Sequence, residues 1–128
     1  MRGNRRFPAN GGLCLESDYA YESGVSQTEG TCQKTCSVVS GSKVAKYVDV
    51  PVSDDAQMMA ALMVQPVAIA IEADQRDFQL YKSGVFTGAC GTNLDHGVLA
   101  VGYGAENGIE YYLVKNSWGT TWGYNGYI

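Results

Sequence analysis

Two strand-like runs, at residues 96–104 and 109–117, constrain the fold of this chain more than any other feature of its sequence. The runs are HGVLAVGYG and IEYYLVKNS, and the turn AENG between them ends in Asn107–Gly108, the dipeptide that tight hairpins prefer. Glycine makes up 16 of the 128 residues, or 12.5%, whereas its usual share in proteins is about 7%. We therefore predict an antiparallel hairpin, in a protein of turns and short strands rather than a helical bundle.

A helix is predicted over residues 53–65, which read SDDAQMMAALMVQ. Ser53 or Asp54 can cap it, acidic residues lie in its first turn, and Pro66 ends it. Its apolar face is formed by Met58, Met59, Leu62 and Met63.

Two further runs predict strands on either side of this helix. The segment KVAKYVDVPV, residues 43–52, alternates in polarity and is stopped by Pro51. The segment PVAIAIEA, residues 66–73, is a short continuous apolar run, which is typical of a buried strand. One helix followed by mostly antiparallel strands predicts an α+β or barrel-like β domain.

Composition excludes several classes of function. A hydrophobic content of 45% suits one globular domain, and a net charge of −4 argues against a nucleic-acid partner. The one basic cluster, Arg2, Arg5 and Arg6, is most simply a solvated tail. The longest apolar stretch is broken at residues 65–66 and is too short to span a membrane, and no signal peptide is visible.

His96 is the only histidine, and it opens the first run of the predicted hairpin. Asn116 closes the second run, so folding at Asn107–Gly108 brings the two residues together. An asparagine oxygen can accept the imidazole N–H, fix the ring tautomer and aim the other nitrogen outward. This is the base-and-orienter half of a catalytic triad, although a lone histidine can also be a plain packing residue.

Several ordered motifs resemble the papain-like cysteine proteases. LDHGVLAVGYG is similar to the histidine motif of that family, and YYLVKNSWGTTWGYNGYI is similar to its asparagine motif. NGGLCLESDYAY resembles a third family segment, with Ala20 where proline is usual, and QPVAIAIEADQRDFQLYKSGVFTGACG resembles the right-hand domain. The resemblance covers roughly residues 9–128.

The resemblance implies roles for individual residues. His96 matches the imidazole that pairs with the nucleophilic thiol, and Asn116 matches the amide that orients it. Trp118 matches the indole that shields their hydrogen bond, with Trp122 nearby. The positions that match the principal specificity pocket, with plain strand packing as the alternative, are Ala70, Leu94 and Gly97.

The same resemblance implies an α+β, papain-like fold that is incomplete at both ends. Residues 1–46 match the tail of the left, mainly helical domain, and residues 47–128 match the right-hand antiparallel β-barrel domain with one helix, truncated at its C-terminal end. Only 13 residues precede Cys14, and no cysteine stands in a CxSCW-like context. The chain is therefore expected to be a fragment that lacks the nucleophile and is inactive alone.

The four cysteines are Cys14, Cys32, Cys36 and Cys90. With one histidine and no CxxC pair, neither a metal site nor any other cofactor is expected, and disulfides in an oxidising compartment fit better. The resemblance implies that Cys32 and Cys90 pair with cysteines outside this chain, so we predict that Cys14 pairs with Cys36. It also implies a lysosomal, vacuolar or extracellular location.

The leading hypothesis is the C-terminal part of a cysteine endopeptidase whose partners are peptide or protein substrates and the missing N-terminal half. The alternative is a non-catalytic homologue that keeps the fold as a binding module. Nucleotide binding through GYGAENG is poorly supported, because this GxG lies between strands and lacks the strand-to-helix context that phosphate binding needs.

Overall fold

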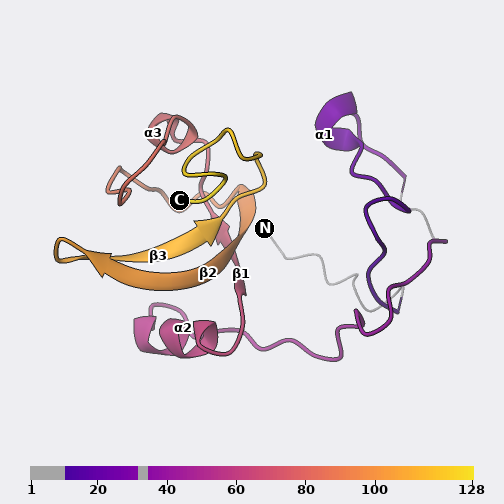
Figure 1. Cartoon of the computed structure of the whole chain (residues 1–128), viewed down its shortest axis with the longest axis horizontal. Coiled ribbons are helices and arrows are strands. Elements are labelled where there is room, and N and C mark those ends of the chain that lie inside the picture. The colour runs from indigo at the N-terminus through magenta and orange to yellow at the C-terminus, as the bar shows by residue number, and fades with distance from the viewer. Residues whose placement is uncertain (1–10, 32–34) are drawn as a thin grey trace. The chain divides into compact units, whose positions relative to one another are not determined.

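The computed structural model describes residues 11–31 and 35–128. The chain forms two compact units, residues 2–48 and residues 49–128, each with contacts of its own (Figure 1). None of the helices in the described residues is long and apolar enough to cross a membrane. The assignment of the first unit to a left-hand domain stays a prediction.

The unit of residues 49–128 is built on a three-stranded antiparallel sheet in the order β1-β2-β3. Its strands are β1 (Val67–Ile71), β2 (His96–Glu106) and β3 (Ile109–Lys115). Asn107 and Gly108 join β2 to β3 with φ angles of 51° and 80°, the left-handed pair that a two-residue hairpin turn requires. The predicted hairpin is confirmed.

The register of β1 against β2 sets the face on which His96 lies. Ile71 stands opposite His96, and Ala70 stands opposite Gly97. Because opposite residues of an antiparallel pair share a face and neighbours alternate, His96 and Ile71 lie on one face and Ala70 and Gly97 on the other. Further along β2, an irregularity in the pairing falls between Ala100 and Gly102.

The prediction of a buried strand at residues 66–73 is correct for the strand and wrong for its burial. The strand β1 forms, but only Val67, Ile69 and Ile71 are partly buried, and the two alanines between them are exposed. A continuous apolar run fits a strand that is buried on both faces, but it also fits a strand that is buried on one face only. An exposed alanine side chain loses little free energy by remaining in water, because its apolar surface is small.

The predicted helix forms as α2 (Asp55–Leu62). Asp54 rather than Ser53 is the cap, because its carboxylate accepts the N–H of Gln57 at 2.9 Å. The hydroxyl of Tyr112 on β3 donates to the Asp55 carboxylate at 2.8 Å, which ties the first turn of the helix to the sheet. Figure 1 shows α2 on one side of the β2–β3 hairpin and α3 on the other.

The aromatic core lies beside α3 (Arg76–Gln79), a four-residue helix that the sequence did not predict. Phe78 of this helix is buried with Ala73, Tyr81 and Trp122, and Ile71 packs against them. The indole N–H of Trp122 donates to the carbonyl oxygen of Gln79 at 3.0 Å. This bond fixes the C-terminal loop against the end of α3.

The predicted strand at residues 43–52 is wrong, since this segment forms no strand in the described part of the chain. Val44, Tyr47 and Val48 are exposed there. Alternation of apolar and polar residues suits a strand with one buried face. A strand forms, however, only where a neighbouring strand pairs with its backbone N–H and C=O groups.

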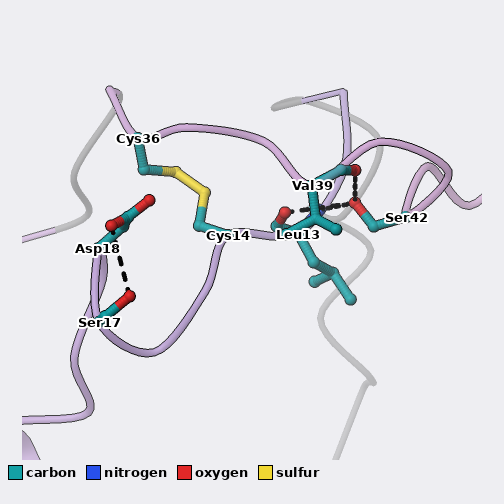
Figure 2. The surroundings of a disulfide bond; sticks show 7 residues. All are labelled: Leu13, Cys14, Ser17, Asp18, Cys36, Val39 and Ser42. Atoms are coloured by element: carbon teal, nitrogen blue, oxygen red, sulfur yellow. Dashed lines mark hydrogen bonds between the residues drawn. A yellow bond between two sulfur atoms is a disulfide. The ribbon is translucent and has the colours of Figure 1, made fainter.

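The unit of residues 2–48 contains the short helix α1 (Ser23–Ser26) and a disulfide. Cys14 and Cys36 are joined with their Cα atoms 6.1 Å apart, as predicted (Figure 2). Next to the disulfide, the hydroxyl of Ser42 accepts the N–H of Leu13 at 2.8 Å and donates to the carbonyl oxygen of Val39 at 2.7 Å. Cys32 lies outside the described residues.

Candidate active site

The centre of the candidate site is a hydrogen bond between the two ends of the hairpin. His96 is the first residue of β2, and Asn116 directly follows β3. The Nε2 atom of His96 lies 2.8 Å from Oδ1 of Asn116. The structure thus brings together the two residues that the sequence predicts to be neighbours.

The backbone of Ser117 fixes the orientation of the Asn116 amide. Its N–H donates to Oδ1 of Asn116 at 2.7 Å. A backbone N–H can only donate, so the Asn116 atom that faces both Ser117 and His96 must be the oxygen. Nε2 of His96 is then the protonated nitrogen, and Nδ1 remains for other chemistry.

The Asn116 side chain is buried, so any of its polar atoms without a hydrogen bond costs free energy. Asn116 is 8% exposed, and its Nδ2 has no hydrogen-bond partner among the described residues. Leaving a buried donor unpaired costs about 1–3 kcal/mol. The side chain is therefore held in place by the two bonds to its oxygen and by the packing around it.

Two tryptophans lie beside the pair. The ring of Trp118 stacks on the imidazole of His96, with centroids 5.1 Å apart and an interplanar angle of 23°. Trp122 meets Trp118 edge to face at 5.2 Å, and Phe78 meets Trp118 in the same way at 5.6 Å. Because Trp122 and Phe78 belong to the buried core, the imidazole is connected to that core by ring contacts.

The predicted pocket residues fall near a cavity of about 950 Å³. Ala70 and Leu94 line this cavity, whereas Gly97 does not, although it stands opposite Ala70 in the sheet. Tyr81 also lines it, and burial, together with the charge of Glu106, raises the pKa of this phenol above its usual 10.0. The Tyr81 hydroxyl therefore stays protonated and donates to the carbonyl oxygen of Gly84 at 2.7 Å.

One residue that bears on the site received no role in the sequence analysis. The carboxylate of Asp95 accepts the N–H of Ala73 at 2.7 Å, and the N–H of Asp95 donates to the carbonyl oxygen of Ile71 at 3.0 Å. These bonds fix the backbone directly before His96. The only signal in the sequence is the acid adjacent to the histidine.

Comparison with known proteins identifies the family. The profile of the papain family cysteine proteases matches residues 4–128. The chain belongs to the papain family. Among curated members, cysteine proteinase COT44 of Brassica napus is 51% identical over 122 residues, which cover 93% of this chain and 35% of that protein. Germination-specific cysteine protease 1 of Arabidopsis thaliana is 52% identical over 122 residues, which cover 93% of this chain and 31% of that protein.

Solved structures of papain-family members show the same fold. The bromelain protease of Ananas comosus, in complex with the E64 inhibitor, matches with a TM-score of 0.80 and 41% identity over 95% of this chain and 54% of that one. The protease CMS1MS2 of Carica candamarcensis, in complex with E-64, matches with a TM-score of 0.73 and 39% identity over 96% and 54%. The chain therefore has a papain-like fold, and it spans about a third of the length of these curated relatives.

A papain-family enzyme needs a thiolate, and the described cysteines do not supply one to His96. Cys14 and Cys36 are bonded to each other, and Cys90 is free and exposed. The Sγ of Cys90 lies 3.6 Å from the carbonyl oxygen of Gly88, whereas the hydrogen bond of His96 goes to Asn116. The described residues also contain no cluster of three or more His, Cys, Asp or Glu side chains that would suit a metal ion.

Proposed function

We propose that this chain supplies the acid–base half of a papain-like cysteine endopeptidase. The observation that carries the proposal is the 2.8 Å contact between Nε2 of His96 and Oδ1 of Asn116, with the oxygen oriented by the Ser117 N–H. An imidazole whose Nε2–H is held in this way has Nδ1 available for proton transfer.

In the proposed reaction, Nδ1 of His96 takes the proton of a thiol, and the thiolate attacks the carbonyl carbon of a peptide bond. As the C–N bond breaks, Nδ1 returns the proton to the leaving amine, and an acyl-thioester remains. Water then attacks the thioester, with Nδ1 as its base, and the thiol is restored. Asn116 orients the ring throughout, and Trp118 shields the hydrogen bond between them.

The thiol in this proposal comes from a segment outside this chain. Cys14 is oxidised in a disulfide, and thiolate chemistry requires a free sulfur with a neighbouring base. The chain by itself is then expected to be inactive, and an N-terminal half is its expected partner.

The substrates are peptides or proteins with a bulky hydrophobic side chain two residues before the scissile bond. Ala70 and Leu94 line the cavity, and a Cβ added at Gly97 would meet nothing within 4 Å. These small or apolar positions leave a roomy pocket without a charged side chain among the three. The disulfide supports an oxidising location, vacuolar, lysosomal or extracellular.

The test is complementation by the thiol-bearing half of a papain-family relative, assayed with a fluorogenic peptide in mild reductant. Turnover should appear only when both halves are present. Asn116→Ala should lower kcat about 10- to 1,000-fold with a smaller effect on KM. Gln57→Ala, which removes a carboxamide from α2, is the matched control and should leave turnover unchanged.

Turnover by this chain alone that disappears on Cys14→Ser would contradict the proposal. Absence of turnover from a folded complex of the two halves would instead favour a non-catalytic binding module. A preference for acidic side chains at the pocket position would contradict the assignment of Ala70, Leu94 and Gly97.

A further inference from the structure

The residues that lead into His96 are held by a side chain to which neither the sequence analysis nor the proposed mechanism assigns a role. Glu72 directly follows β1, and its Oε2 accepts the N–H of Asn93 at 2.8 Å. Its Oε1 accepts the side-chain N–H of Gln75 at 2.7 Å. Gln75 is the residue before α3, so one carboxylate joins the end of β1, the start of α3 and the loop of residues 91–95.

The loop returns a similar bond to the strand. Asp95 accepts the backbone N–H of Ala73, just as Glu72 accepts that of Asn93. Each segment therefore presents a carboxylate to a backbone donor of the other, and hydrogen bonds to charged acceptors are stronger than neutral ones. Leu94 lies between the two anchored loop residues, and both Leu94 and Glu72 line the cavity.

The loop also packs closely on the carboxylate. A Cβ atom added at Gly91 would lie 2.5 Å from Cδ of Glu72 and would overlap its oxygens. A side chain at position 91 would therefore displace Glu72 or the loop. The absence of a side chain at Gly91 thus leaves room for the Glu72 carboxylate, which accepts the hydrogen bond of Asn93 two residues further along the loop.

We propose that Glu72 is a positioning residue that holds the loop of residues 91–95 and thereby sets the shape of the substrate pocket at Leu94. Each of its oxygens already accepts a hydrogen bond from the protein, so Glu72 acts through the loop rather than by contact with substrate. The selectivity part of this inference rests on the proposed peptidase function.

The first test uses the 128-residue chain and needs no activity. Glu72→Ala should raise the hydrogen-exchange rate of the Asn93 amide by about tenfold or more, because its acceptor is lost. Glu72→Gln keeps one acceptor oxygen and should retain most of the protection. Glu110→Ala, which removes a different carboxylate from the lining of the same cavity, is the control for charge and should leave the Asn93 amide unchanged.

The second test uses the complemented enzyme and two substrates that differ only at the pocket position, phenylalanine against glycine. Glu72→Ala should raise KM for the phenylalanine substrate about tenfold, with kcat changed much less and the glycine substrate little affected. Glu72→Gln should restore the phenylalanine preference, a result that a merely structural role does not predict.

Equal loss of kcat on both substrates, or unchanged exchange at Asn93 in Glu72→Ala, would overturn the inference. If the unaltered complemented enzyme shows no turnover, the proposed function and the selectivity claim fail together. The exchange of Asn93 would then still decide whether Glu72 holds the loop.

Discussion

The two units of this chain are stabilised in different ways. Residues 49–128 form a hydrogen-bonded sheet with a buried aromatic cluster, and the charged and polar side chains of the candidate site lie at the ends of its strands. In the described part of residues 2–48, one disulfide and a few short hydrogen bonds hold the backbone, and no residue of α1 is buried.

The difference shows in the large apolar side chains. Tyr21 is 73% exposed and Val25 is 90% exposed, whereas Phe78 is 7% exposed. A segment that buries little apolar surface gains little from the hydrophobic effect, and a covalent cross-link can then restrict its unfolded state instead. Side-chain packing thus positions the candidate site in residues 49–128, whereas the stability of residues 2–48 depends on the disulfide between their cysteines.

The largest expected effect comes from removing the centre of the aromatic cluster. Phe78→Ala should lower the free energy of unfolding of residues 49–128 by about 3–5 kcal/mol, because it leaves a cavity between Trp118 and Trp122. Urea unfolding followed by tryptophan fluorescence measures this change. The exchange of the Val39 amide, which bonds to Leu13 in the other unit, should not change. A loss at Val39 would contradict the different sources of stability described above for the two units.

Removing the disulfide tests the opposite unit. The double substitution Cys14→Ser with Cys36→Ser should destabilise the cross-linked segment by roughly 3 kcal/mol, as expected for a loop of this length in the chain-entropy model. Exchange protection at Val39 should then fall while that at Val114, which bonds to Ile128, persists. Peptide mapping of the unaltered chain that finds Cys14 and Cys36 free would remove the basis of this prediction.

A smaller effect is expected at Ser42. Ser42→Ala removes the acceptor of the Leu13 N–H and the donor to Val39, at a cost of about 1–2 kcal/mol. Amide exchange of Leu13 and Val39 measures this loss. Unchanged exchange at both amides would show that the disulfide alone holds the segment.

The smallest effect is expected at Tyr112. Tyr112→Phe removes the bond to Asp55 and should cost about 1 kcal/mol near neutral pH. Burial first, then the bond to Asp55 and the charges of Asp55 and Glu110, raise the pKa of this phenol above 10.0. Its contribution to stability is thus complete below pH 10 and is lost as the pH rises through the raised pKa. Urea midpoints of the two proteins should therefore converge on the alkaline side.

The parts of the fold that could be predicted depend on local signals. Asn107–Gly108 defines the hairpin, and the comparable distances of His96 and Asn116 from this turn predict their contact. Asp54 ahead of an apolar helical face predicts α2 within a few residues. In each case the physical cause, a left-handed turn or a capped first turn, is contained in a few adjacent residues.

The parts that could not be predicted depend on distant partners. The alternation around Tyr47 does not reveal that no strand pairs with it in the described residues, and the apolar run of β1 does not say that Ala70 is exposed. The helix α3 has no capping side chain, and burial of Phe78 is its main support. The carboxylate of Glu72 accepts the backbone N–H of Asn93, 21 residues away, a relation that no local pattern encodes.

The hairpin also has a consequence for the order of events during folding. His96 and Asn116 are 20 residues apart, but closing the one turn between them is enough to bring them together. Hairpins of this kind form in about 1–10 μs, and contacts between nearby residues form ahead of distant ones. We therefore expect the imidazole and the amide to meet before the aromatic cluster has packed. In a longer chain, His96 and Asn116 would therefore come together on the emerging sheet before more distant segments dock.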